Sequence, residues 1–210
     1  DFCAPNIPTT QISGRLRYEF RLPNSSRTDW ETNTTIADAV DILAVSVRGA
    51  TLVHATSTSP TGDFSLRVPS PYAAGDQVIF FAVGTDGQGR VLYAAANPGL
   101  PPNSMNVIPT ASPLPAATLW SWAVPANIAN TTRIITEAEG SGALRLFHNQ
   151  RRTYEFTRQF YRQSGRTVVL WFAPSTTWSC GACAAPIPTN ASGVSFDAQV
   201  WISGGANQPQ

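Results

Sequence analysis

The stretch Gly140–Gly165, GSGALRLFHNQRRTYEFTRQFYRQSG, has the pattern of one long helix in a chain otherwise composed of short β-like runs. Its apolar residues recur at the three- and four-residue spacing that gathers side chains on one helical face. These residues are Leu144, Phe147, Tyr154 and Tyr161, with Ala143, Leu146 and Phe160 at the margins. Ser141 is placed to cap the first turn and Gly165 to end the last. We therefore predict a helix over Ser141–Ser164.

Strand-like runs follow this helix. Thr167–Phe172 and Phe196–Ile202 are rich in β-branched and aromatic residues, and a loop rich in cysteine, proline and glycine separates them. Glu137 and Glu139 stand just before the helix, where the positive end of the helix dipole favours carboxylates. A helix covering one face of a small sheet is the simplest arrangement, and we predict such an α+β unit over residues 118–205.

The first part of the chain has the pattern of a β-sandwich. Residues 11–20 alternate apolar and polar side chains, as a half-buried strand does. Further short strands are predicted up to residue 96, separated by turns such as Asp86-Gly-Gln-Gly89. We predict an immunoglobulin- or transthyretin-like sandwich over 11–96 and a proline-rich linker over 97–117. The expected fold class is mainly β with one long helix.

The composition argues against several classes of protein. Hydrophobic residues make up 42% of the 210, which is enough for a core, so disorder is not expected. Only 13% of residues are charged and the net charge is +1, so the chain lacks the basic field that attracts nucleic acid. No run approaches the roughly 20 apolar residues needed to cross a bilayer. The chain starts at Asp1 without methionine, which fits removal of an export signal or a segment boundary.

Cysteines and sequons favour an extracellular or cell-surface location. Cys180 and Cys183 form a CxxC pair in a predicted loop, and Cys3 makes the count odd. We expect structural disulfides, including a bridge from Cys3 to one of the pair, with metal binding and redox chemistry as the alternatives. The candidate N-glycosylation sites are Asn24, Asn33, Asn130 and Asn190.

Four short motifs follow one another in the predicted sandwich. They are Ile-Ser-Gly-Arg at 12–15, Val-Ser-Val at 45–47, Ser-Pro-Thr-Gly-Asp-Phe-Ser-Leu at 59–66 and Gln-Val-Ile-Phe-Phe at 77–81. This order resembles the transthyretin-like or carboxypeptidase-regulatory-like modules of exported proteins. In that family a turn ending in glycine, here Gly62, precedes an aromatic residue, here Phe64, that plugs the end of the core. The resemblance implies a binding or spacing module without catalytic residues.

The second part of the chain also has a characteristic order of elements. A strand is followed by Ile-Thr-Glu-Ala-Glu-Gly-Ser-Gly-Ala at 135–143, which opens the helix. Val-Val-Leu-Trp-Phe at 168–172 and Phe-Asp-Ala-Gln-Val-Trp-Ile-Ser-Gly-Gly at 196–205 come next. This order resembles the amino-terminal half of an exported zincin-type metallopeptidase, in which a strand, a backing helix and further strands precede the metal-binding helix. That helix needs HExxH, because the spacing places two imidazoles on one face beside the general base. The motif is absent, so the resemblance transfers no catalytic residue or metal ligand.

Other candidate chemistry is sparse. His54 with Asp63 suggests a metal site, although a lone histidine is more often a surface group. His148 stands alone on the predicted helix. The tryptophans on predicted strands fit core packing, whereas Trp30 and Trp178 lie in loops and are the candidates for a partner surface. No cofactor is predicted.

These features predict a non-catalytic extracellular or cell-surface protein with a structural or interaction role, including that of a subunit in a larger assembly. A protein partner or self-assembly is expected, and carbohydrate is a further candidate ligand. Two alternatives stay open. The chain is the amino-terminal fragment of a secreted zinc metallopeptidase whose catalytic helix lies outside it, or the sandwich is a carbohydrate- or peptide-binding module.

Overall fold

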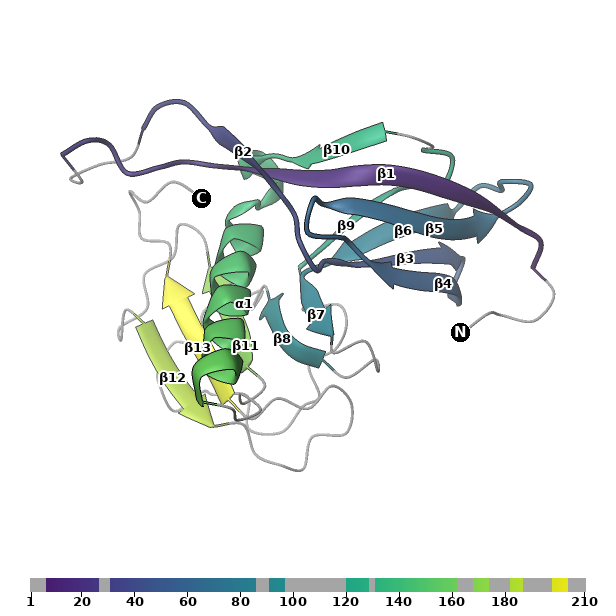
Figure 1. Ribbon diagram of the computed structural model, residues 1–210. Coiled ribbons are helices and arrows are strands. Elements are labelled where there is room, and N and C mark those ends of the chain that lie inside the picture. The colour runs from purple at the N-terminus through teal and green to yellow at the C-terminus, as the bar shows by residue number, and fades with distance from the viewer. Residues whose placement is uncertain are drawn as a thin grey trace. The chain divides into compact units, whose positions relative to one another are not determined.

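A computed structural model shows a mainly β fold with one long helix, which confirms the predicted fold class (Figure 1). The residues that the structure describes are 7–26, 31–85, 91–96, 120–128, 131–161, 168–173, 182–186 and 198–203. The predicted linker at 97–117 lies outside these ranges.

The chain divides into two compact units, each assembled from three separate segments. Unit 1 comprises Asp1–Tyr18, Ile36–Phe81 and Ser121–Ile135, and unit 2 comprises Glu19–Thr35, Ala82–Trp120 and Thr136–Gln210. The predicted division into 11–96 and 118–205 does not match these units, because each predicted range contributes strands to both. The physical reason is pairing between strands that are far apart in the chain, which no local pattern encodes.

Unit 1 is a β-sandwich of two sheets. In the first sheet, β1 (Thr9–Phe20) is antiparallel to β5 (Asp63–Pro69) and parallel to β10 (Thr131–Ile135), and β2 (Thr35–Asp38) also lies beside β1. The second sheet is antiparallel in the order β4-β3-β6-β9. Its strands, in that order, are Thr51–Ser57, Leu43–Arg48, Asp76–Phe81 and Ser121–Pro125.

Apolar side chains from both sheets fill the interior of the sandwich. Leu16 of β1, Leu66 of β5 and both Val78 and Phe80 of β6 are fully buried. Along β5 and β6 every second side chain points inward, as the pleat of a strand requires. Phe64, which follows the Gly62 turn, is buried edge to face against Phe80 with ring centroids 5.2 Å apart.

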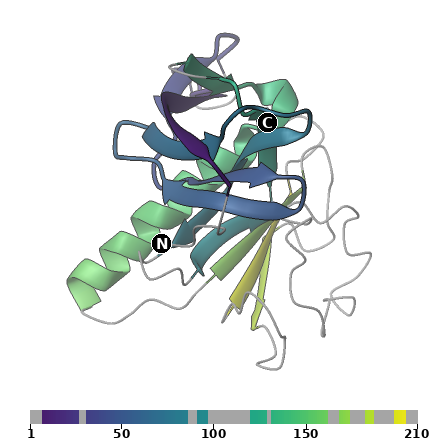
Figure 2. The ribbon, with the colours of Figure 1, turned by 90° about the vertical axis from the view of Figure 1, so that its right-hand side faces the viewer.

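Unit 2 combines a five-stranded sheet with the helix (Figure 1, Figure 2). The strand order is β7-β8-β11-β13-β12. These strands, in that order, are Val83–Thr85, Val91–Ala96, Val168–Ala173, Ala198–Ser203 and Ala182–Pro186. β8, β11 and β13 run parallel, whereas the edge strands β7 and β12 are antiparallel to their neighbours.

The helix α1 (Gly142–Tyr161) packs on β8 and β11 of this sheet. It agrees with the predicted helix within its described length, and residues 162–167 lie outside the described part. Ala143, Leu144 and Phe147 are buried, whereas Phe156 and Phe160 near the other end are exposed. The buried residues fall on one face because they are separated by the spacing of a helical turn.

Candidate functional site

The sheet of unit 2 carries an antiparallel edge strand beside three parallel strands. β12 pairs with β13 along Ala182–Pro186, and no second strand pairs with it among the described residues. In the described part of the chain β12 is therefore the outermost strand on this side of the sheet. An edge of this kind can bind an extended peptide as an additional strand. The chemistry that this arrangement offers is recognition of a polypeptide backbone.

An ion pair fixes the segment that leads into α1. Arg21 donates from Nε and Nη2 to the Glu137 carboxylate, at 2.9 and 2.7 Å, and Glu19 accepts a hydrogen bond from the Glu137 amide. Glu139 accepts from the amide and the hydroxyl of Thr136, both at 3.0 Å. Glu137 and Glu139 form a short 3-10 helix, η2 (Glu137–Glu139). Their carboxylates therefore hold the entry to α1 together, which is a structural role.

Ser141 does not cap α1, contrary to the prediction. It directly precedes the helix and is fully buried, yet its hydroxyl has no hydrogen-bond partner in the described part of the chain. The side chains of Thr136 and Glu139 bond to each other in the preceding turn instead. A buried hydroxyl that lacks a partner lowers stability, because it has lost its hydrogen bonds to water.

Ser141→Ala should therefore leave unit 2 as stable as in the wild type, or stabilise it by up to about 1 kcal/mol. Removal of a working N-cap would instead cost about 0.5–2 kcal/mol. The measurement is the free energy of unfolding from a urea titration followed by circular dichroism. Thr136→Ala, which removes a hydroxyl that donates to Glu139, is the matched control and should destabilise the chain. A clear loss of stability in Ser141→Ala would show that the hydroxyl does act as a cap.

The two histidines do not form the centre of a catalytic or metal-binding group. Burial is the main cause of a lowered pKa in both His54 of β4 and His148 of α1, and neighbouring arginines lower both pKa values further. The carboxylate of Asp63, the suggested partner of His54, binds Arg15 and Thr61 instead. The described residues contain no group of three or more histidine, cysteine, aspartate and glutamate side chains that could hold a metal ion.

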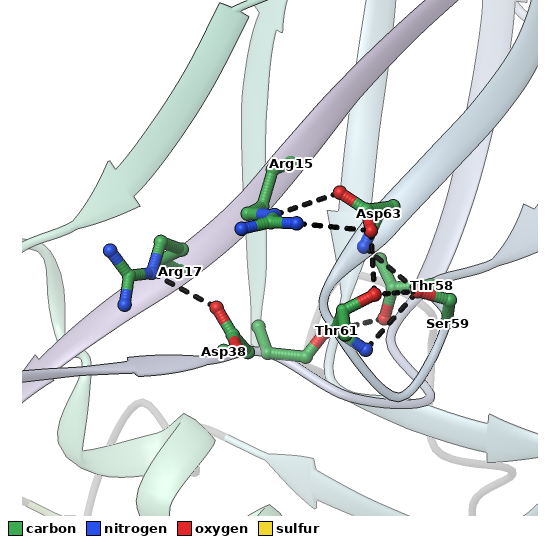
Figure 3. A network of polar contacts seen from close by, with 8 residues as sticks. Arg15, Arg17, Asp38, Thr58, Ser59, Thr61 and Asp63 are labelled. Carbon is green, nitrogen blue, oxygen red and sulfur yellow. Dashed lines mark hydrogen bonds and ion pairs between the residues drawn. The ribbon is translucent and has the colours of Figure 1, made fainter.

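A polar network surrounds the turn between β4 and β5 (Figure 3). Arg15 forms a two-bond ion pair with Asp63 at 2.8 and 3.2 Å. The hydroxyl of Ser59 accepts hydrogen bonds from the amides of Thr61 and Asp63, and the hydroxyl of Thr61 donates to Asp63. Arg15 and Asp63 are nearly half exposed, and such ion pairs contribute little stability. The network therefore fixes the conformation of the turn through hydrogen bonds between residues of the turn itself.

A hollow of about 310 Å³ lies in unit 1, between residues 72–77 and residues 123–127. The first wall is the loop that enters β6, and the second comprises the end of β9 and the turn after it. β6 and β9 are paired neighbours, with Gln77 opposite Pro125, so the two walls are joined by the sheet. The volume is at the lower end of the range for small-molecule sites.

An ion pair between a buried carboxylate and a partly exposed arginine supports the first wall of this hollow. Asp76 is 5% exposed, and its carboxylate accepts from Arg48 Nε at 3.0 Å and from Arg48 Nη2 at 2.7 Å. The Ala73 amide donates to the same carboxylate at 2.8 Å. The hydrogen bonds from Arg48 and Ala73 hold the pKa of Asp76 below its usual value. Arg48 also donates to the Pro71 carbonyl, so it connects β3 with the loop that precedes β6.

Arg48→Met should lower the stability of unit 1 more at neutral pH than in acid. Because the folded pKa of Asp76 is lowered, the pair stabilises the fold above the unfolded-state pKa of about 3.9 and loses that contribution as the pH falls through the folded value. The difference in free energy of unfolding between the wild type and Arg48→Met should therefore become smaller below about pH 4. Urea titrations at neutral pH and at about pH 3 measure the difference. Arg15→Met, which breaks the exposed pair with Asp63, is the control with a smaller expected effect. If the loss of stability in Arg48→Met is the same at both pH values, the ion pair with Asp76 is not its cause.

Most of the site residues suggested by the sequence lie outside the described residues: Cys3, Cys180, Trp30, Trp178, Asn130 and Asn190. Cys183 falls in β12, opposite Trp201 in the pairing with β13. Asn24 is half-buried and accepts a hydrogen bond from the Ser26 hydroxyl, and Asn33 is exposed. Disulfide pairing and glycosylation stay predictions.

The hollow and its ion pair are the features that the sequence reasoning missed. Gly75-Asp76 has the composition of a turn, and this is how it is read in the sequence. The sequence does show one indication of the ion pair: Asp76 is a single carboxylate at the start of an apolar strand. A carboxylate needs a cation once it is buried. Its partner Arg48 lies on β3, and only the pairing of β3 with β6 brings the two together.

Within the described ranges, no helix combines the length and the apolar character needed to cross a membrane. The chain matches no protein-family model, and comparisons with curated proteins and with solved structures found no match either. Its function therefore has to be inferred from its own geometry.

Proposed function

We propose that the chain is the amino-terminal, non-catalytic part of an exported zinc metallopeptidase of the zincin type. The observation that carries the proposal is the arrangement of unit 2. A strand, β8, is followed by the helix α1 packed on the sheet and then by β11, β12 and β13. This is the order of strand, backing helix and strands that precedes the metal-binding helix in the zincin fold. β9 and β10, which lie between β8 and α1 in the chain, belong to unit 1.

The sheet topology supports a role in substrate binding for this part of the proposed enzyme. Because β8, β11 and β13 are parallel, their carboxyl ends share one edge of the sheet, where ligand sites form in sheets of this kind. β12 borders β13 and offers its outer edge to an extended peptide. A polypeptide substrate bound along the outer side of β12 would be separated from β13 by one strand.

Zinc ligation of the zincin type does not fit the residues that the structure describes. The sequence contains no HExxH, and the described residues include no group of three candidate ligands. No catalytic step is therefore assigned to the 210 residues. The metal and the general base of the proposed enzyme would come from a segment outside this sequence.

The coding sequence beyond Gln210 tests the proposal. An HExxH motif soon after this position supports it, and a stop codon without such a motif contradicts it. The longer polypeptide should cleave casein, and it should lose this activity when a zinc chelator is added or when the glutamate of the motif is replaced by glutamine. The 210-residue chain is the matched negative control and should not cleave casein.

A second candidate is a non-catalytic cell-surface protein that assembles with copies of itself or with a protein partner. It is favoured by the aromatic pair Phe156 and Phe160 on α1. These side chains are 54% and 64% exposed, and their ring centroids are 4.4 Å apart. Exposed aromatic residues are enriched in the surfaces through which proteins associate.

The mass of the native material, extracted without reducing agent, separates the two candidates. Multiples of 22.5 kDa support assembly of this chain, and a longer polypeptide that contains it supports the metallopeptidase. Serine at both Phe156 and Phe160 should dissociate such an assembly, whereas Leu52→Ser, at a residue that is 40% exposed in unit 1, should not. A monomer at high protein concentration with no recovered partner contradicts the second candidate.

A further inference from the structure

We infer that the hollow between residues 72–77 and 123–127 of unit 1 binds a neutral saccharide, one sugar residue at a time. This inference is independent of the metallopeptidase proposal, because it concerns the sandwich and uses no residue of unit 2. It rests on three properties of the hollow: a fixed frame, the absence of a free charge on its described lining, and a combination of an apolar surface with amide side chains.

The frame of the hollow is held by hydrogen bonds that do not involve a ligand. The Ala126 amide donates to the Asp76 carbonyl at 3.1 Å, which ties the second wall to the first. The Asp76 amide donates to the Ala73 carbonyl at 3.1 Å, and the Asp76 carboxylate accepts from the Ala73 amide. Arg48 holds the same carboxylate from β3. A site preorganised in this way loses little conformational entropy when it binds a ligand.

The charge of the hollow favours a neutral ligand. Asp76 is the one ionisable acid or base among its lining residues, apart from the weakly acidic phenol of Tyr72. The Asp76 side chain is 2% exposed, and both of its oxygens accept hydrogen bonds from Arg48. The charge is therefore neutralised inside the protein, and the lining offers no free cation or anion to pair with an ionic ligand.

The lining of the hollow combines apolar and amide side chains, the two kinds of group that contact a sugar ring. Tyr72 is 44% exposed, and the neighbouring lining residues carry small apolar side chains. Those residues are Ala73, Ala74, Ala123 and Pro125. An aromatic ring beside small apolar groups can contact the C–H face of a pyranose. Gln77 and Asn127 are exposed, and among the described residues their side chains have no hydrogen-bond partner. Each amide supplies both donors and an acceptor, as vicinal hydroxyl groups require.

A saccharide fits this position better than a peptide does. Among the described residues β9 is the last strand of its sheet, a position at which an extended peptide can add. At the hollow, however, β9 ends in Pro125, which has no amide hydrogen to donate to an added strand. The volume of about 310 Å³ suits a single ring-sized group, with the rest of a glycan chain remaining in solvent.

The test is titration of the uniformly ¹⁵N-labelled, full 210-residue chain with four neutral trisaccharides, built from glucose, mannose, xylose or N-acetylglucosamine. At least one of them should shift the backbone amide signals of residues 72–77 and 123–127. Tyr72→Ala should weaken that binding by about tenfold or more, and Gln77→Ala and Asn127→Ala should each weaken it by several-fold. Leu52→Ala, at an exposed apolar residue elsewhere on the same sheet, should bind as the wild type does.

Three results of the trisaccharide titrations would overturn the inference. They are no shift with any of the four trisaccharides, shifts confined to other residues, and unchanged affinity in Tyr72→Ala. Preferential binding of a proline-rich peptide at the hollow would overturn it in favour of a peptide ligand. Tyr72→Phe keeps the ring and should retain most of the affinity. The amide spectrum of Tyr72→Ala should match that of the wild type outside residues 72–77 and 123–127, which distinguishes lost binding from misfolding.

Discussion

Replacing Gly62 with alanine is expected to destabilise unit 1 by about 3–5 kcal/mol. Gly62 has a φ of +75°, a left-handed conformation that costs a residue with a Cβ about 1–2 kcal/mol. An added Cβ would also collide with the carbonyl oxygen of Leu16, which is a backbone atom of the central strand β1. That atom cannot move without breaking the hydrogen bond that it accepts from the Ala39 amide at 3.0 Å.

The position of Gly62 in the turn explains why this effect should spread through the sandwich. Its carbonyl accepts a hydrogen bond from the Leu16 amide at 2.8 Å, and its amide donates to Ser59. Asp63 and Phe64 follow at once, so a displaced turn would disturb both the pair with Arg15 and the packing of Phe64 on Phe80. A single methyl group therefore acts on the turn, on β1 and on the core.

Native-state hydrogen exchange measures the effect within unit 1. Because every 1.4 kcal/mol is a factor of ten, the protection of the slowest amides in β1 and β5 should fall by at least about a hundredfold. Gly49→Ala is the matched control. Gly49 also has a positive φ, +58°, but no atom lies within 4 Å of an added Cβ, so only the conformational cost of about 1–2 kcal/mol should remain. Equal effects in the two variants would mean that the contact with β1 is relieved without cost.

The turn at Gly62 also illustrates what the sequence can predict. Local signals suffice where one short stretch determines the structure: the alternation along residues 11–20 predicts β1, and the Ser-Pro-Thr-Gly-Asp turn predicts the break before β5. The long helix follows from the spacing of its apolar residues. These elements need no partner for their pattern to be visible, because the pattern comes from the burial of one face.

Two strands form only because they pair with neighbouring strands, so their local sequence does not predict them. β12 has the sequence Ala-Cys-Ala-Ala-Pro, with no β-branched or aromatic residue, and the sequence predicts a loop there. β2, Thr-Ile-Ala-Asp, has only four residues, which is too short for an alternating pattern to identify it. Pairing with β13 and with β1 makes these segments strands. Since β12 is the edge that the proposed function uses, the weakest sequence signal coincides with the element of greatest functional interest.

Long-range pairing also limits prediction of the units and of the hollow. Gly14 of β1 pairs with Thr131 of β10, and Gln77 of β6 pairs with Pro125 of β9. Both pairs join strands on opposite sides of the proline-rich stretch at 97–117, which composition marks as a boundary. The lining of the hollow comes from both sides of this stretch. A division by local composition therefore separates residues that the fold brings together.

Gly140→Ala should destabilise unit 2 by about 2–4 kcal/mol. Gly140 has a φ of +85° and lies between η2 and α1, where the chain turns into the helix. An added Cβ would overlap the ring of Trp120, colliding with Cζ3 and lying 2.6 Å from Cη2. The Trp120 carbonyl accepts from the Ala82 amide at 3.0 Å, which restrains the backbone of that residue while the ring is pushed aside.

The contribution of the Trp120 ring can be separated from that of the backbone conformation. Gly75 has a similar φ, +88°, with no atom within 4 Å of an added Cβ, so Gly75→Ala should show the conformational cost alone. In a double-mutant cycle, Gly140→Ala should cost less when Trp120 is already leucine, because the smaller side chain can accommodate the methyl group. Free energies of unfolding from urea titrations provide the four values of the cycle. If the two substitutions are additive, the collision with Trp120 contributes nothing and the left-handed backbone alone explains the requirement for glycine at the entry to α1.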